Sequence, residues 1–286
     1  MSPKIQNKIF DYVVALIVLI AVFVCLVPFL YIFSESLSSN RAIISQAVTV
    51  YPIDFNIEAY KVVFGDAGML YSLFYTAVLT LAFVLVSMTV TILASYPLTK
   101  KRLKGRNAIL LLMLVTMYFT GGLIPDYMLV KNLGLLNTPF ALVLPGMMSV
   151  YYMIIMKSFF QNLPESLEEA AYLDGCNDLQ ILFKIVLPLS KPALATISLL
   201  YAVFRWNYFQ DALFYITKQN LYTIQLKLYN VINITQQLPG ENANVNLPSE
   251  ALKAASIVFG TVPILLVYPW LQKYFVSGIM IGAVKG

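Results

Sequence analysis

Residues 12–34 read YVVALIVLIAVFVCLVPFLYIFS, a run of 23 residues without Asp, Glu, Lys or Arg. A helix needs about 20 consecutive apolar residues to cross the hydrocarbon core of a bilayer. The run exceeds the 7–15 apolar residues of a cleaved signal peptide, and bulky residues 22–24 precede Cys25 where a processing enzyme prefers small ones. The stretch therefore predicts a retained membrane-spanning helix.

The composition of the whole chain agrees with this assignment. Hydrophobic residues make up 59% of the 286 residues and charged residues 12%, and the mean hydropathy is +0.76. Ordinary soluble domains are about 45–50% apolar and about 25% charged. The composition thus predicts an integral membrane protein, and it excludes a basic soluble domain that binds nucleic acid.

Residue usage also argues against metal and redox chemistry. The chain has no His, which removes imidazole ligands, imidazole bases and His-based proton relays. Its two cysteines, Cys25 and Cys176, are too few for a disulfide framework and lack metal-site spacing. We expect no metal site and no catalytic residue.

Further charge-poor stretches predict the other spans, and together they indicate an all-α polytopic membrane protein. Six transmembrane helices are expected, at about 12–34, 70–97, 107–125, 138–157, 188–210 and 254–273. The fifth is the least regular, because Arg205 lies within it. All six belong to a single transmembrane domain that covers residues 1–286.

The distribution of Lys and Arg predicts the orientation of the chain. Twelve of the 19 basic residues fall on the side of the two termini and seven on the other side. Because cytoplasmic loops carry the excess of Lys and Arg, both termini are predicted to be cytoplasmic. The cluster at 100–106 is interpreted as a topology and lipid-headgroup feature, and 35–66 and 211–253, with a turn-rich stretch at 238–248, are expected outside.

The segment 162–188, between the fourth and fifth predicted spans, carries the pattern of a cytoplasmic helix–turn–helix. Pro164 suits the first turn of a helix, and Glu165 and its neighbours place negative charge near the positive end of the helix dipole. Gly175 suits the left-handed residue at which a helix ends. A second helix is expected at 178–187, ending at Pro188.

Residue spacing predicts the faces of these two helices. In the second helix one apolar face is expected to contain Leu179, Leu182, Phe183 and Val186. In the first helix the pair Ala170–Ala171 leaves a low surface that another protein's backbone can approach. Interfacial helices that lie on lipid prefer a Lys/Arg-rich polar face. The acidity of this helix therefore favours a protein partner over the lipid surface.

The same segment resembles a known signature. Glu169-Ala-Ala-Tyr-Leu-Asp-Gly175, nine further residues and Ile185-Val-Leu-Pro188 match the EAA motif of binding-protein-dependent ABC importer permeases. The family's alanine after the glycine is replaced here by Cys176. The resemblance implies that 162–188 is the segment that couples a permease to its ATPase. The coupling residues that it implies are Glu165, Glu168, Glu169, Ala170, Ala171, Asp174, Gly175, Ile185, Leu187 and Pro188.

The resemblance extends along the whole chain. The stretch 121–137, the pair Trp206–Asn207 and the ending 277–282 are similar to the carbohydrate-uptake (maltose-type) branch. More narrowly, they resemble the LplC/YtcP-type oligosaccharide permeases of Gram-positive bacteria. The resemblance implies a location in the bacterial plasma membrane and a substrate such as pectic or rhamnogalacturonan fragments, by analogy alone.

The resemblance also implies the partners of the chain. They are a second, non-identical permease, two cytoplasmic ATPase subunits that use ATP and Mg, an extracellular solute-binding lipoprotein, and membrane lipid. The chain itself lacks the G-x-x-x-x-G-K-[ST] loop that cradles ATP phosphates, so no cofactor is expected on it and it is not expected to be an enzyme.

Two alternatives remain open at this stage. An ion- or proton-coupled carrier that acts alone would usually bury Asp, Glu or His in the bilayer. The charge-free runs contain no such residue. A membrane scaffold whose acidic hairpin only docks a soluble protein is the second alternative.

Aromatic and amide side chains in the third, fourth and fifth spans are candidates for contact with sugar, since aromatic faces and hydrogen-bonding groups hold hydroxyl-rich rings. The candidates are Tyr118, Phe119, Tyr151, Tyr152, Tyr201, Arg205, Trp206, Asn207 and Gln210. Tyr and Trp also favour the membrane interface for other reasons. Arg205 is expected to snorkel to the outer surface, with contact to the binding protein or closure of an external gate as the alternatives. Its spacing of six residues from Asp211 is not that of a helical ion pair.

Overall fold

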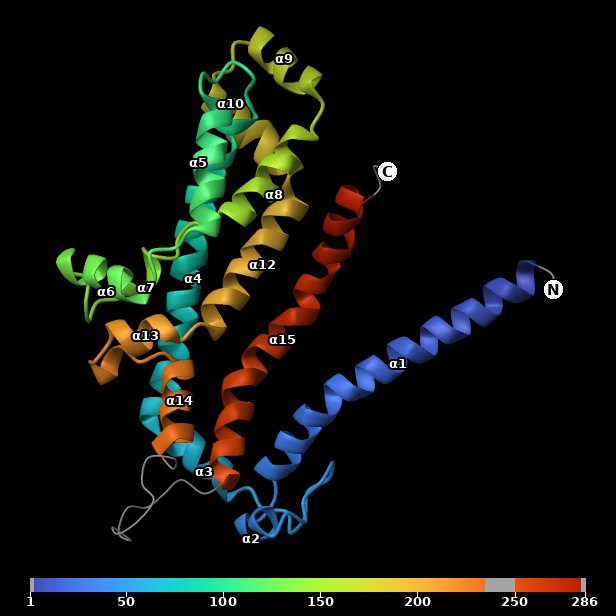
Figure 1. Cartoon of the computed structure of the whole chain (residues 1–286), viewed down its shortest axis with the longest axis vertical. Coiled ribbons are helices and arrows are strands. Elements are labelled where there is room, and N and C mark those ends of the chain that lie inside the picture. Colours follow the sequence, from blue (N-terminus) through green and yellow to red (C-terminus); the bar gives the residue numbers. More distant parts are fainter. Residues whose placement is uncertain (1–2, 235–249, 284–286) are drawn as a thin grey trace. The chain divides into compact units, whose positions relative to one another are not determined.

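The computed structural model describes residues 3–234 and 250–283, and over these residues every regular element is a helix (Figure 1). The predicted all-α fold is therefore confirmed. The chain forms two compact units, one from residues up to 70 with 227–263 and the other from 71–226 with 264 onward. The predicted turn-rich stretch 238–248 lies outside the described residues.

The first unit begins with the long apolar helix α1 (Pro3–Ser36), which contains the predicted span 12–34. Its apolar side chains from Phe10 to Phe33 are mostly exposed, so this surface needs lipid or protein to cover it. The short helices α2 (Asn40–Ile44) and α3 (Glu58–Gly65) follow. Helix α15 (Glu250–Ala283) begins in this unit, and Ala251 packs with Ile43 and Val48 in a small core.

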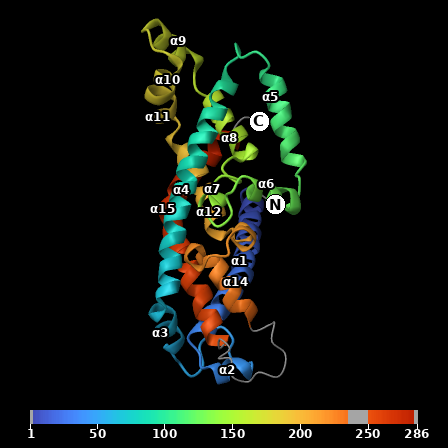
Figure 2. The same ribbon diagram turned by 90° about the vertical axis from the view of Figure 1, so that its left-hand side faces the viewer.

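The second unit contains most of the remaining helices. Their bounds are α4 (Ala67–Ser95), η1 (Pro97–Thr99), α5 (Arg106–Tyr118), α6 (Leu123–Asn132), α7 (Phe140–Val143), α8 (Val150–Gln161), α9 (Glu165–Leu173), α10 (Asp178–Ile181), η2 (Leu182–Val186), α11 (Leu187–Leu189), α12 (Lys191–Asn207), α13 (Gln210–Tyr215), η3 (Gln219–Leu221) and α14 (Ile224–Ile234). Helix α4 starts, and α14 ends, in the first unit. Figures 1 and 2 both place α9 and α10 at the end of this unit where α4 ends and α5 begins.

The core of the second unit lies among α4, α8 and α12. Phe83, Met156 and Ile197 are fully buried there, and the Tyr201 hydroxyl is hydrogen-bonded to the Thr91 hydroxyl at 2.8 Å. The backbone N–H of Ser149 also donates to the Tyr201 oxygen at 3.0 Å. A buried hydroxyl needs such partners, since an unpaired polar group in an apolar interior is costly.

The predicted spans differ in how regular they are. Three helices are long and apolar enough to cross a membrane, and they cover the predicted spans 12–34, 70–97 and 254–273 at least in part. Two further candidates are bent pairs, in which α5 meets α6 at 112° and the helical stretch from α10 to α11 meets α12 at 83°. By length and composition the described residues thus offer three spans, or up to five when each bent pair counts as one.

The fourth predicted span, 138–157, is not one helix. It falls on α7 and α8, which are separated by residues 144–149. That stretch includes Pro145 and Gly146, two residues that interrupt helices. The count of six spans stays a prediction.

Candidate functional site

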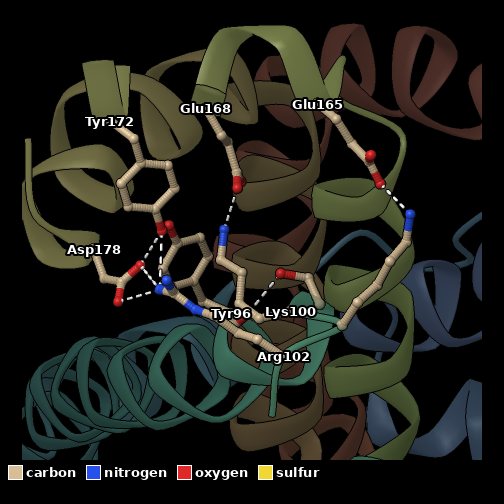
Figure 3. Close-up of polar contacts among 9 residues, drawn as sticks. Tyr96, Lys100, Arg102, Glu165, Glu168, Tyr172 and Asp178 are labelled. Carbon is tan, nitrogen blue, oxygen red and sulfur yellow. Dashed lines mark hydrogen bonds and ion pairs between the residues drawn. The ribbon is translucent and has the colours of Figure 1, made fainter. Parts of the chain in front are cut away.

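The acidic helix α9 turns one face toward the loop that joins α4 to α5. Glu165, Glu168 and Tyr172 are spaced three and four residues apart, so they lie on one face of the helix. Figure 3 shows this face opposite Lys100 and Arg102 of the loop. The predicted coupling segment and the predicted basic cluster, 60 or more residues apart in sequence, therefore form one site.

The two lysines of the loop pair with the two glutamates. Lys100 is hydrogen-bonded to Glu168, and Lys101 Nζ lies 2.7 Å from Glu165 Oε1. The hydrogen bond from Lys101, together with its charge, lowers the pKa of Glu165 below that of an ordinary carboxyl group. The Lys101–Glu165 pair is therefore charged at neutral pH and is lost only when the pH falls below the usual carboxyl range.

Arg102 reaches both helices of the predicted helix–turn–helix. Its Nη2 donates to both carboxylate oxygens of Asp178 at 2.5 Å and to the Tyr172 hydroxyl at 3.0 Å. The Tyr172 hydroxyl in turn donates to Asp178. The Asp178 charge raises the pKa of Arg102 still further, so the guanidinium stays charged. Arg102 thus bridges α9 and α10.

These contacts correct the interpretation of residues 100–106 as a topology and lipid-headgroup feature alone. Lys100, Lys101 and Arg102 neutralise acidic groups of the chain itself. They also weaken the argument that the acidity of α9 requires a protein partner. A pairing between segments so distant in sequence leaves no periodic signal, so it could not be read from the sequence.

The turn between α9 and α10 has the geometry that the sequence predicts. The N–H of Cys176 donates to Ala171 O at 2.9 Å and the N–H of Gly175 donates to Tyr172 O at 3.0 Å, which together form a Schellman motif. Gly175 has φ +83°, a value that only glycine adopts without strain. Asn177 then caps α10 in a reciprocal capping box with Gln180.

The second helix of the segment differs from the prediction at Pro188. A π-helical turn, η2, follows α10, and helical backbone continues through Pro188 to Leu189 before it ends at Ser190. The N–H of Leu187 bonds to Leu182 O, five residues back, which is the π-helical pattern, and Pro188 has no N–H of its own to donate.

The wide π turn also changes which residues share a face. Leu182 and Val186 are buried as predicted, whereas Leu179 and Phe183 are exposed, and Ile181 joins the core instead. Leu182 and Val186 are four residues apart and share a face, and the π turn breaks the regular α-helical spacing on which the predicted face was based. The predicted four-residue face was therefore wrong. Ile185 and Leu187 are partly buried.

The face of α9 that points away from the loop is exposed and mostly uncharged. It contains Ser166, Ala170 and Leu173, and the Leu173 side chain is 90% exposed. Ala171 is buried in the core, so only Ala170 offers the low surface that was predicted for both alanines.

The two remaining acidic residues of the segment, Glu169 and Asp174, are exposed. Neither has an ion-pair partner among the described residues. Glu169 lies at the edge of a hollow of about 440 Å³ between the loop and α9, with Lys100, Lys101 and Glu168. It is therefore the carboxylate of α9 that is available to an external partner.

The predicted sugar contacts do not gather in one place. Tyr201 and Trp206 are buried, and the Tyr152 ring packs against Tyr201 with centroids 4.8 Å apart. Tyr118, Phe119 and Tyr151 are exposed aromatic residues on α5 and α8 or at their ends, and Asn207 and Gln210 are exposed polar residues near the end of α12. None of these five exposed residues lines the hollows described in this section for the described part of the chain.

Arg205 does not snorkel to the surface as expected. Its side chain is 2% exposed and pairs with Asp211, and it also donates to Leu142 O at 3.0 Å and Tyr208 O at 2.7 Å. The pair forms because α12 ends at Asn207 and the chain turns before α13, which brings Asp211 back toward the arginine. The i,i+4 spacing of ion pairs applies only within an unbroken helix, so it did not predict the Arg205–Asp211 pair.

A second hollow, of about 520 Å³, adjoins this ion pair. Asp126 of α6 lines it together with Arg205, Tyr208 and Asp211. Of the predicted sugar contacts, Arg205 alone lines it. In the described ranges, no three acidic or cysteine side chains come together as a metal site would need.

Comparison with known proteins places the chain in a family. The model of the family described as "Binding-protein-dependent transport system inner membrane component" matches residues 67–281. The chain is 39% identical to the polygalacturonan/rhamnogalacturonan transport system permease protein YtcP of Bacillus subtilis, over 98% of this chain and 100% of that protein. It is 41% identical to the protein LplC of the same organism, over 92% and 90% of the two chains.

A solved structure supports the same assignment. The structure is that of a bacterial ABC transporter involved in the import of the acidic polysaccharide alginate, and it matches with a TM-score of 0.85 and 35% identity over 96% of this chain and 99% of that one. The chain therefore belongs to the family of binding-protein-dependent transport system inner membrane components, as a membrane-embedded permease rather than an enzyme.

Proposed function

We propose that this chain is one of two non-identical permease subunits of an ATP-driven importer for oligosaccharides, with pectic fragments as the substrate class. Its similarity to a polygalacturonan/rhamnogalacturonan permease supports this substrate class. In this proposal two cytoplasmic ATPase subunits bind and hydrolyse ATP with Mg, and an extracellular lipoprotein delivers the sugar. The permease itself binds no cofactor.

The exposed face of α9 is the observation that carries this proposal. Leu173 is almost fully exposed, Ala170 leaves a low surface beside it, and Glu169 offers an unpaired carboxylate. A cleft on the ATPase would bury the leucine, which stabilises the complex by about 1.5–3 kcal/mol relative to leaving the side chain in water. The ATPase would also supply a cation for Glu169.

The proposed cycle begins when ATP closes the two ATPase subunits on each other. The coupling segments then move with the ATPases, and the spans change from inward-facing to outward-facing. Each state must bind its ligands differently for the nucleotide to shift this equilibrium. The cycle requires the α9–α10 end to be cytoplasmic, as the Lys and Arg distribution predicts.

Three exposed aromatic residues remain our proposed contacts for the sugar. Tyr118 and Phe119 lie at the end of α5, and Tyr151 lies in the first turn of α8. Their exposed faces suit the stacking of pyranose rings. Of the other aromatic candidates, Tyr201 is buried in the core, Tyr152 is partly buried against it, and Trp206 is buried.

Co-purification with a matched pair of leucine variants tests the docking surface. We expect Leu173→Asp to lose the ATPase subunits in a gentle-detergent pull-down of the tagged chain. Leu133→Asp is the control, because Leu133 is also exposed but lies at the end of α6, away from the segment. Equal recovery of the ATPase with both variants would contradict the proposed docking surface.

Uptake by the reconstituted complex tests the reaction and the substrate. We expect uptake of pectic oligosaccharides that requires ATP and the binding protein and that an ionophore does not abolish. Uptake by the chain alone, abolished by an ionophore, would instead establish an ion-coupled carrier.

A further inference from the structure

We infer that Lys100, Lys101 and Arg102 are positioning residues that tie the coupling segment to α4 and α5, so that movement of the segment is passed to these helices. We call the three residues the basic clasp. The inference rests on the proposed function, since it assigns a role to the clasp in coupling. It adds residues outside the segment that the family signature marks.

The covalent chain does not explain how movement of the segment reaches α4. The segment is joined directly to α8 at one end and to α12 at the other. Helices α4 and α5 have no such connection, because their joining loop is more than 60 residues away in sequence. Tyr96, at the end of α4, belongs to the same apolar core as Ala171 and Leu182 of the segment. The basic clasp adds polar contacts from this loop to the segment.

Two hollows border the basic clasp. A hollow of about 440 Å³ lies on one side of it, lined by Lys100, Lys101 and Arg102, and another of about 460 Å³ is lined by Lys100, Arg102 and Lys104. Ion pairs and hydrogen bonds therefore hold the tip of the loop to the segment. A contact of this kind can be removed by changing charges without opening a hole in the core.

The three contacts reach both helices of the segment. Lys100 and Lys101 hold α9 through Glu168 and Glu165, and Arg102 holds Tyr172 of α9 together with Asp178 of α10 (Figure 3). The clasp thus spans the Schellman turn at Gly175. Since it restrains both sides of the turn, α9 and α10 move as one body with the loop.

Lys100 is the member that contributes most. Its side chain is 14% exposed and that of Glu168 is 24% exposed, whereas the values are 80% and 74% for Lys101 and Glu165. Its Nζ also lies 4.2 Å from the centroid of the Tyr96 ring, near the end of α4. Exposed ion pairs are screened by water and contribute little to stability, so the effects should decrease with increasing exposure, from Lys100 to Arg102 to Lys101.

The Tyr96 ring extends the contact from the clasp to α8. It packs edge-on against Phe160 of α8, with centroids 6.3 Å apart. Lys100 therefore lies where the end of α4, the end of α8 and the start of α9 meet. This position suits a residue that keeps the three helices in register as the segment moves.

Charge reversal in the complete reconstituted transporter tests the inference. We expect Lys100→Glu to retain the ATPase subunits and to hydrolyse ATP, but to import about tenfold less substrate per ATP hydrolysed. The double variant Lys100→Glu with Glu168→Lys should restore most of this ratio. Lys104→Glu is the control, since Lys104 is exposed in the same loop and has no ion-pair partner among residues 3–234 and 250–283.

The outcomes separate this inference from the proposed function. An unchanged ratio of import to hydrolysis in Lys100→Glu, or a double variant that is not restored, would overturn the role of the clasp and leave the importer assignment intact. A wild-type chain that fails to bind any ATPase would overturn both. Loss of the ATPase in Lys100→Glu alone would make the clasp part of the docking surface and would also overturn its role as a relay.

A cross-link provides a second measurement. Cysteines at positions 101 and 165, in a chain with Cys25 and Cys176 replaced by serine, can be joined by a short bismaleimide. If the loop and α9 move together, the linked transporter should retain ATP-driven uptake. Loss of uptake on linking, with recovery in the unlinked double-cysteine chain, would show that the clasp must open and would overturn the inference.

Discussion

Arg205 is buried near the end of α12, and its guanidinium group is held by several oxygen atoms. Its guanidinium has four acceptors: Leu142 O, Tyr208 O and the two carboxylate oxygens of Asp211. The first two are backbone carbonyls, in α7 and just after α12. The side chain therefore links the backbone of α7 to the turn that follows α12.

Removal of this arginine should strongly destabilise the protein. Arg205→Met leaves the Asp211 charge largely buried without its partner, which typically costs about 3–5 kcal/mol. Thermal unfolding of the purified protein in detergent measures the effect. The double variant Arg205→Met with Asp211→Leu should recover part of the loss, because it removes the orphaned charge. Equal stability of wild type and Arg205→Met would show that the pair contributes little.

Gly175 is a residue whose importance lies in its backbone. Its φ of +83° costs a residue with a Cβ about 1–2 kcal/mol. An added Cβ meets nothing within 4 Å, so crowding plays no part. We expect Gly175→Val to lose substrate import more than Gly175→Asn, since asparagine tolerates left-handed geometry better. Gly65→Val, at a glycine with open space and ordinary φ, is the control. Equal activity of both Gly175 variants would contradict this explanation.

At the scale of elements, several helices end in connections that hold the structure together. Asn137, in the connection between α6 and α7, has φ +58°. Its side-chain oxygen accepts hydrogen bonds from the N–H of Thr217 at 2.7 Å and from that of Lys218 at 3.1 Å. It thereby joins the segment after α6 to the segment after α13.

Three substitutions separate the two roles of Asn137. Asn137→Ala loses the hydrogen bonds and must keep the strained φ, so we expect the largest loss of stability, about 2–3 kcal/mol. Asn137→Gly relieves the strain but loses the bonds, and Asn137→Asp keeps an acceptor. The thermal unfolding temperature should therefore be highest for Asn137→Asp, lower for Asn137→Gly and lowest for Asn137→Ala. A glycine variant as unstable as the alanine variant would show that backbone strain is unimportant here.

At the scale of the whole molecule, the orientation in the membrane is a prediction that labelling can test. In a chain without Cys25 and Cys176, a cysteine at Tyr51 should react with a membrane-impermeant maleimide in intact cells. A cysteine at Lys104 should react only after the cells are permeabilised. Both positions are exposed, so access depends on the side of the membrane. The reverse pattern would invert the topology and place the coupling segment outside.

The sequence alone determined those features that depend on local patterns. Apolar length predicted the continuous helices α1, α4 and α15, because crossing a bilayer requires about 20 apolar residues. The proline, acidic residues and glycine of 164–175 predicted α9 and its left-handed end. The EAA motif predicted the family, which the comparisons confirm.

Tertiary structure decided what depends on residues distant in sequence. The pairing of residues 100–102 with the coupling segment joins positions more than 60 residues apart, and Arg205 meets Asp211 only because α12 ends between them. The π turn before Pro188 likewise interrupts the regular spacing from which Leu179 and Phe183 were assigned to the core face, and both are exposed. Periodicity describes an unbroken helix, so it fails where a helix breaks. Charge partners are chosen by spatial proximity in the fold, which the local sequence does not encode.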